Sequence, residues 1–237
     1  MISTRFIEED GSITQKSALI SASYHLTLNE KRVLMIAMSK VNPLSKLWLD
    51  NGEVKIYAQE LVNTFDIDQA NSYKVLRESL NSLWTRSLWL YGDCKDGEKI
   101  RWLSRQKYSE GEGSITINFG REVVGYLSGM VDYFTSDKIL AASGFKSVYS
   151  IRLYELCCQC LNTGWRVISV EDLRYAFGLE NEYEKWSDLR HWVLNKAVDE
   201  INEKSDIVVS YTVIKAGRNI KAIKILIERN DQYQLPL

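Results

Sequence analysis

The sequence is poor in the residues that build rigid linkers, disulfide frameworks and metal sites. Its 237 residues include two prolines, four cysteines and two histidines. Three of the cysteines, Cys157, Cys158 and Cys160, fall on one expected helix, where a disulfide framework is geometrically implausible. The histidines, His25 and His191, are isolated in the sequence, so they do not complete a ligand set. We expect reduced thiols in a core and no bound metal.

Three further signals are missing from the sequence. It has no run of about 18 apolar residues, and its first residues contain no signal-peptide core. We therefore expect a cytoplasmic protein without a membrane span. It also lacks a GxxxxGK[ST] phosphate loop, the nearest string being residues 144–147, and its histidines lie far from any obvious nucleophile. We predict a protein that is not an enzyme and binds no cofactor.

The composition is that of a globular protein, with 45% hydrophobic and 26% charged residues. The length suits two small domains, each able to bury its own core. A net charge of -1 and a pI of about 6.2 count against a protein that binds DNA through its overall positive charge. The charges are unevenly distributed, however, because segments 95–107 and 206–229 each carry five basic and two acidic residues.

One pattern occurs twice, at an offset of 112 positions. Residues 54–67 read VKIYAQELVNTFDI, and residues 166–179 read RVISVEDLRYAFGL. Four apolar positions recur in register: Ile56, Leu61, Phe65 and Ile67 as Ile168, Leu173, Phe177 and Leu179. The first copy predicts a strand over 53–57 and a helix over 58–65, and the second predicts a strand over 166–168 and a helix over 170–177.

Each copy is followed by a second amphipathic helix and then by β-rich segments. The helices are expected at about 69–84 and 183–204, and the strands at 87–91, 100–108, 114–119, 207–214 and 220–227. Further helices are expected at 29–40, with Asn29 as its N-cap, and at 121–127, 135–142 and 147–161. This order is that of a winged-helix unit. We predict an α+β protein of two tandem winged-helix domains related by internal duplication.

In a winged helix the second helix can enter a DNA major groove, and the β-hairpin can contact phosphates. Both predicted second helices have an apolar stripe and a polar face with basic residues, and both charged segments coincide with an expected hairpin. An isolated amphipathic helix is more often a solvated surface, but the duplication favours double-stranded DNA as the partner. The contact residues predicted from this pattern are Lys74, Arg77, Lys99, Arg101, Lys185, Arg190, His191, Asn195, Lys215, Arg218 and Lys221.

Several strings together resemble the initiator replication proteins of iteron-containing plasmids. They are residues 18–34 (ALISASYHLTLNEKRVL), 149–156 (YSIRLYEL), 168–174 (ISVEDLR) and 193–202 (VLNKAVDEIN). The resemblance covers about residues 16–228. It implies a tail at 1–15, a first winged-helix domain at 16–128 for DNA contact and dimerisation, and a second at 134–230 that binds origin repeats in the major groove.

The resemblance also implies a function. Monomers on the origin repeats would promote opening of the origin and recruit the host initiator and the replicative helicase. A homodimer, in equilibrium with the monomer, would repress the protein's own gene. The base-reading residues that the resemblance implies are Lys185, Arg190 and His191, and their counterparts in the first half are Ser72, Tyr73, Lys74 and Arg77. Relatives carry further arginines after the position of Arg190, where this chain has His191 and Trp192, so the bases contacted are expected to differ.

Two alternatives remain open. One is a transcriptional repressor built on the same two winged helices. The other is a protein-interaction module whose winged helices bind a partner protein instead of DNA, which the basic hairpins disfavour.

Overall fold

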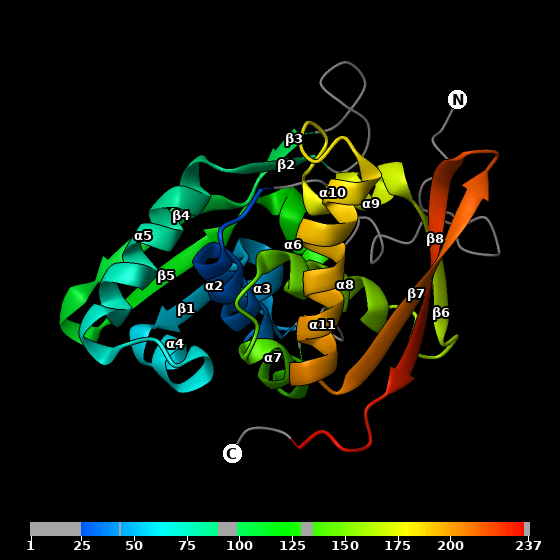
Figure 1. The fold of residues 1–237 in the computed structure, drawn as a ribbon. Helices are drawn as coiled ribbons and strands as arrows, with labels where there is room; N and C mark the ends of the chain where they lie inside the picture. The colour runs from blue at the N-terminus through cyan, green and yellow to red at the C-terminus, as the bar shows by residue number, and fades with distance from the viewer. Residues whose placement is uncertain (1–24, 43, 90–98, 129–134, 235–237) are drawn as a thin grey trace.

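The computed structural model describes residues 25–42, 44–89, 99–128 and 135–234 (Figure 1). The elements of the first half are α2 (Leu28–Ser39), α3 (Lys46–Asn51), β1 (Glu53–Tyr57), α4 (Ala58–Phe65), η2 (Gln69–Asn71), α5 (Ser72–Thr85), β2 (Ser87–Trp89), β3 (Lys99–Arg101), β4 (Leu103–Ser109), η3 (Glu110–Glu112), β5 (Ser114–Phe119) and α6 (Arg121–Ser128). Those of the second half are α7 (Ser136–Ser143), α8 (Val148–Cys158), β6 (Trp165–Ser169), α9 (Val170–Phe177), α10 (Trp186–Leu189), the π turn η5 (Arg190–Leu194), α11 (Asn195–Lys204), β7 (Ile207–Ala216) and β8 (Asn219–Arg229).

The predicted duplication is confirmed at the level of single residues. Strand β1 and helix α4 recur as β6 and α9 at the same offset of 112 positions. Both helices end on a left-handed residue at matching positions, Asp66 with φ 52° and Gly178 with φ 67°. The left-handed conformation closes the last helical turn and redirects the chain, and glycine adopts it without steric cost. The two copies therefore share their end geometry as well as their apolar pattern.

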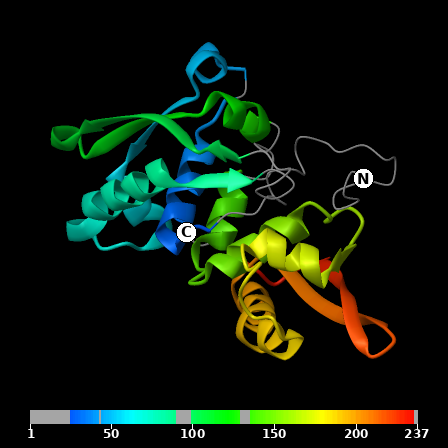
Figure 2. The ribbon, with the colours of Figure 1, turned by 90° about the horizontal axis from the view of Figure 1, so that it is seen from above.

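The two sheets also have the same topology. In the first, the strand order is β1-β5-β4, and in the second it is β6-β8-β7, all antiparallel. In each sheet the first strand of the unit pairs with the last one. The repeated isoleucine of the first strand lies opposite an isoleucine of the last: Ile56 of β1 opposite Ile115 of β5, and Ile168 of β6 opposite Ile223 of β8. Figures 1 and 2 show the two units side by side, with the blue-to-green half on one side and the yellow-to-red half on the other. The predicted fold class is confirmed.

The repeated apolar positions form the core. Among them Ile56, Leu61 and Leu173 are inaccessible to solvent. One cluster of buried hydrophobic residues runs through both halves, because α2, α7 and α8 pack between the two sheets. The thiols of Cys157 and Cys158 are also buried, as predicted, and burial raises the pKa of Cys158 to about 12, so the thiol stays protonated at neutral pH.

Two local predictions are corrected by the structure. Helix α2 is capped by Thr27, whose hydroxyl accepts the Glu30 backbone N–H at 3.3 Å, and not by Asn29. The Glu30 carboxylate in turn accepts the Thr27 backbone N–H at 2.6 Å, so the two residues form a capping box. The helix expected over 183–204 begins only at Trp186 and is interrupted by the π turn. Among the described residues, no helix is long and apolar enough to span a bilayer.

Candidate nucleic-acid interface

The helix from α10 to α11 buries one side and presents a run of polar residues on the other. Leu189, Val193 and Leu194 are all buried, although Val193 and Leu194 are neighbours in the sequence. The apolar face of the helix is broad enough to include both neighbours, and it continues into α11 as Ala197 and Ile201. It leaves Arg190 and His191 exposed in succession, as predicted.

Trp192 extends this exposed run. Its side chain is 53% exposed, which is unusual for tryptophan on a polar helical surface. The His191 ring meets it edge-on at 4.6 Å between centroids, and the Lys196 Nζ lies 4.5 Å from the centre of the Trp192 ring. A cation over an aromatic ring is attracted by the ring's quadrupole. Sequence reasoning treated Trp192 only as a departure from the family pattern and did not select Lys196.

The hairpin β7–β8 is tied to this helix by a hydrogen bond. The Tyr211 hydroxyl on β7 donates to Asn195 Oδ1 at 2.5 Å. Burial raises the pKa of Tyr211, and the charge of nearby Arg190 opposes that rise in part. Asn195 is therefore already engaged inside the domain, and its amide NH₂ is the group left to donate to a ligand.

The tip of the β7–β8 hairpin is basic, as predicted. Ala216 pairs with Asn219, so Gly217 and Arg218 form a two-residue turn, in which Gly217 has φ 63°. Such a turn requires a residue that tolerates positive φ at its first central position, and glycine supplies it. Lys215, Arg218 and Lys221 are all exposed around the tip. Their ammonium and guanidinium groups are therefore available to phosphate oxygens.

The loop before the helix is held by an arginine that sequence reasoning missed. Arg174 on α9 donates to the backbone carbonyls of Glu182 and Glu184 at 2.6 and 2.7 Å. These bonds fix the backbone that leads to Lys185, which is exposed and occupies the N-cap position of α10. A basic residue in the last turn of α9 is the sequence signal for such a contact.

The corresponding helix of the first domain is α5. Lys74 and Arg77 are exposed on it, and Tyr73 is half-buried, with a pKa raised first by burial and then by Glu110. Ser72 is buried, and its hydroxyl donates to the Gln69 carbonyl at 2.8 Å. The prediction that Ser72 contacts DNA has no structural support, because its side chain is sequestered at the start of α5. We leave it out of the interface.

The wing of the first half was predicted with two turns and with basic residues near its tip. The second of these turns, between β4 and β5, carries Glu110 and Glu112, and Glu112 pairs with Lys55. Lys99 and Arg101 are exposed on β3, which pairs with β2 in a separate two-stranded sheet. The segment joining these strands, including Lys95, lies outside the described residues. The tip of the β4–β5 hairpin is thus acidic.

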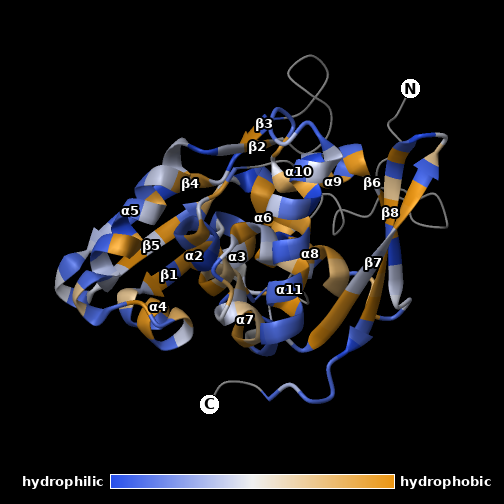
Figure 3. Ribbon diagram, viewed as in Figure 1, coloured by the Kyte–Doolittle hydropathy of each residue, from blue (hydrophilic) through white to orange (hydrophobic). Residues whose placement is uncertain are grey.

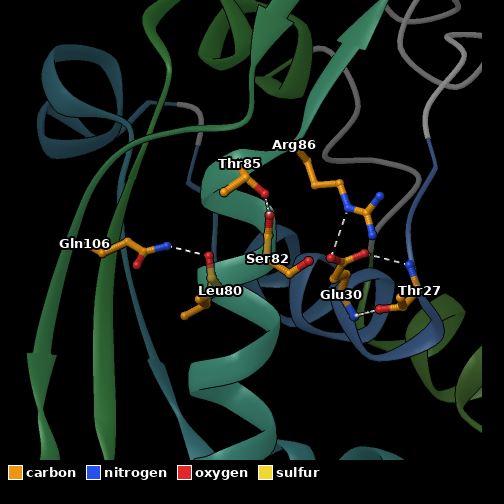
Figure 4. A network of polar contacts seen from close by, with 7 residues as sticks. All are labelled: Thr27, Glu30, Leu80, Ser82, Thr85, Arg86 and Gln106. Carbon is orange, nitrogen blue, oxygen red and sulfur yellow. Dashed lines mark hydrogen bonds and ion pairs between the residues drawn. The ribbon is translucent and has the colours of Figure 1, made fainter.

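Helix α2 connects the interface helix of the first domain to the second half. Glu30 accepts a hydrogen bond from Arg86, the C-cap of α5, at 3.2 Å (Figure 4). Figure 4 also shows Gln106 of β4 donating to the Leu80 carbonyl at 2.5 Å, which fixes α5 to the first sheet. The next residue, Lys31, forms a buried ion pair with Glu155 on α8, with Nζ and Oε1 2.7 Å apart.

Two more contacts continue this connection. Arg32 donates to the Phe145 carbonyl between α7 and α8 at 3.1 Å. Arg152, buried on α8, donates to the Ala176 carbonyl at the end of α9 at 2.6 and 3.0 Å. Three consecutive residues of α2 therefore reach the end of α5, the middle of α8 and the α7–α8 loop. Charged groups buried in this way hold their partners in a defined geometry.

The matching folds and topologies of the two halves define a protein of two tandem winged-helix domains. A family model described as the WH1 domain of initiator replication proteins matches residues 12–158, and one for the WH2 domain of initiator Rep proteins matches residues 169–227. The chain belongs to this family of initiator replication proteins. The domain boundary predicted between 128 and 134 falls largely outside the described residues and stays a prediction.

Known proteins agree with this assignment. The PI protein of Escherichia coli is 27% identical, with 92% of this chain and 83% of the relative covered. A replication initiation protein of Escherichia coli is 23% identical, with 94% of this chain and 71% of the relative covered. The crystal structure of a Pi initiator protein in complex with iteron DNA aligns with a TM-score of 0.74 and 23% identity, covering 92% of this chain and 96% of that one. At this identity, the structural likeness establishes the fold.

Proposed function

We propose that this protein initiates the replication of a plasmid by binding direct repeats, or iterons, in duplex origin DNA. One observation carries the proposal: Arg190 and His191 are exposed on the second helix of a winged-helix domain, and a hydrogen bond ties that helix to a hairpin with a basic tip. This arrangement suits base contact in the major groove together with phosphate contact beside it. Family membership and the DNA-bound Pi structure of the same fold support it.

The proposed contact set combines readout and anchoring. In the second domain, Arg190, His191 and Lys185 read bases, while Asn195 contributes its free amide. In the first domain, Lys74 and Arg77 contact the neighbouring groove, with Tyr73 at its edge. The phosphate contacts are made by Lys99, Arg101, Lys215, Arg218 and Lys221. Two helices reading one face of a duplex would span two major grooves, so the repeat is expected to be about 20 base pairs long.

The wider function rests on the family. Bound monomers open the origin and recruit the host initiator and the replicative helicase, and a dimer represses the protein's own gene. The protein acts in the cytoplasm, where plasmid DNA is replicated, and it needs no catalytic activity of its own for this role.

The proposal is tested by measuring retardation of a labelled duplex that contains repeats from the protein's own origin, beside a scrambled duplex of equal length and composition. We expect retention of the repeat duplex at nanomolar protein concentration and much weaker binding of the scrambled one. Equal binding of both duplexes would contradict sequence-specific recognition.

A genetic test separates initiation from repression alone. A plasmid that carries the origin but lacks this gene is introduced into cells that supply the protein in trans. We expect the plasmid to be maintained only when the protein is present. Maintenance without the protein, combined with release of a reporter driven by the gene's own promoter, would favour a plain repressor.

A further inference from the structure

The three-stranded sheet of the second domain has one face toward the helices and one toward solvent. On the inner face Ile223, Ile225 and Val209 are buried. Because side chains alternate along a strand, the residues between them point outward. The strand register places Trp165, Leu226 and Ser210 in one outward row, and Val167, Lys224 and Thr212 in the next.

The outward face of this sheet is unusually apolar. Its exposed hydrophobic side chains are Trp165 (44% exposed), Val167 (48%), Leu226 (38%), Val208 (40%) and Ile214 (39%). They come from all three strands, and the sheet stands at the edge of the molecule away from the first winged helix (Figures 1 and 2). Figure 3 shows hydrophobic residues along β7 and β8 at this edge. Exposed apolar side chains gathered on one face of a sheet are typical of a protein-binding surface.

The charges on this face are arranged symmetrically. Along β8 the outward residues are Ala222, Lys224, Leu226 and Glu228, so a lysine and a glutamate flank Leu226 at equal distances. The Lys224 Nζ lies over the Trp165 ring, 5.2 Å from its centre. This order of charges is complementary to itself when the strand is reversed. A second copy of the same strand, running antiparallel across Leu226, meets it with opposite charges in register.

We propose that this outward face is a self-association surface, through which a second copy of the chain packs sheet against sheet. A two-fold axis along the row of Trp165, Leu226 and Ser210 sets Leu226 against Leu226 and Lys224 against Glu228 of the second copy. The interface is isologous, so each charge pair occurs twice. The alternative two-fold axis, along the strands, sets Lys224 against Lys224 and is disfavoured.

This surface differs from the dimerisation assigned to the first half by family resemblance. It also leaves the proposed DNA contacts accessible, because α11 packs on the inner side of the same sheet. Copies that associate here can each keep their second helix and hairpin tip on DNA. The surface itself does not depend on the proposed function, since it follows from the apolar face and the order of its charges.

A charge-reversal cycle tests the proposal on the full-length protein. Sedimentation velocity is used to measure self-association of the wild type, Lys224→Glu, Glu228→Lys and the double variant. Each single reversal turns two attractive contacts into two repulsive ones, so we expect self-association to weaken about tenfold. The double variant restores opposite charges in register and is expected to return to within about twofold of the wild type. Single variants that associate like the wild type, or a double variant that stays impaired, would overturn the proposal.

Two single-cysteine variants test the proposed packing of the two copies independently. Leu226→Cys lies on the proposed axis and meets its own copy, so mild oxidation is expected to give a disulfide-linked dimer. Thr212→Cys is exposed on the same face but off the axis, and is expected to cross-link little more than the wild type. Equal cross-linking of the two variants would contradict this packing. Retained binding of origin DNA by the variants shows that they are folded. If the wild type itself binds no origin repeats, the proposed function fails, but the sedimentation and cross-linking measurements still test self-association.

Discussion

At the scale of single residues, exposure decides which of the predicted side chains are available to DNA. Arg190 and Lys185 were selected because they lie off the apolar stripe, and the structure leaves both exposed. Ser72 was named only through the family resemblance, as a first-half counterpart of these residues, and its side chain is buried and bonded to Gln69. A small hydroxyl at the start of a helix competes for nearby backbone groups, so its position in a helical pattern does not establish exposure.

The first prediction concerns Arg190. Replacing it with alanine removes a guanidinium able to bind a guanine edge at two points, and we expect binding to origin repeats to weaken by about 1 to 3 kcal/mol. Binding to scrambled duplex should change far less. The measurement is fluorescence anisotropy with both duplexes at one salt concentration. Arg121→Ala, which alters another exposed arginine on α6, serves as the control, and an equal loss on both duplexes would remove Arg190 from base readout.

At the scale of elements, local signals predicted the repeated strand and helix well. The bounds of β1 and α4 agree with those predicted, because alternation, helical periodicity and end residues lie within a few positions of one another. The same reasoning failed at α2, where Thr27 and not Asn29 is the cap. It also missed the π turn, because no local pattern distinguishes five-residue from four-residue hydrogen bonding.

The second prediction concerns this cap. Thr27→Ala removes the hydroxyl that accepts the Glu30 N–H and opens the capping box, so we expect a loss of about 1 kcal/mol in the free energy of unfolding. Asn29→Ala is the matched control and should change stability by only a few tenths of a kcal/mol. Urea denaturation followed by circular dichroism measures both. A larger loss of stability for Asn29→Ala than for Thr27→Ala would mean that Asn29 is the cap.

The third prediction concerns the β7–β8 hairpin. Neutralising Lys215, Arg218 and Lys221 with glutamine should weaken binding to all duplexes and reduce the slope of log K against log[salt] by about 3, because three phosphate contacts no longer release counterions. The slope is measured by titration at several salt concentrations. The control removes three exposed cations elsewhere, at Arg121, Lys146 and Arg229. Equal slopes for the wild type and the hairpin variant would mean that the tip does not touch phosphate.

At the scale of the whole molecule, α2 joins parts of the chain that are distant in sequence. Lys31 meets Glu155 across 124 positions, and both side chains are buried, at 3% and 6% exposure. A buried ion pair is often no more stabilising than a hydrophobic pair of the same size, but removing one partner leaves an uncompensated charge. The pair therefore contributes more to the fixed arrangement of the two halves than to net stability.

The fourth prediction tests this arrangement. Lys31→Met leaves the buried Glu155 carboxylate with the Arg152 guanidinium, 3.4 Å away, but without its closer ammonium partner, so we expect the free energy of unfolding to fall by about 3 kcal/mol. Lys31→Met combined with Glu155→Gln removes both of these charges, but it also takes the carboxylate from the buried Arg152, which lies 3.4 Å from Glu155, so it should recover only a part of that loss. Denaturant titration of the three proteins gives the values. A single variant within about 0.5 kcal/mol of the wild type would show that the pair is not coupled to folding.

The sequence by itself determined the two winged-helix units, their repeated strand and helix, and the basic hairpin of the second half, because periodicity, turns and charge are encoded over short stretches of chain. Only the tertiary structure decided that Asn195 is held by Tyr211, that Glu30 joins α2 to the end of α5, and that Lys31 and Arg32 connect α2 to the second half. These features depend on contacts between residues far apart in the chain, and such contacts exist only once the core has closed.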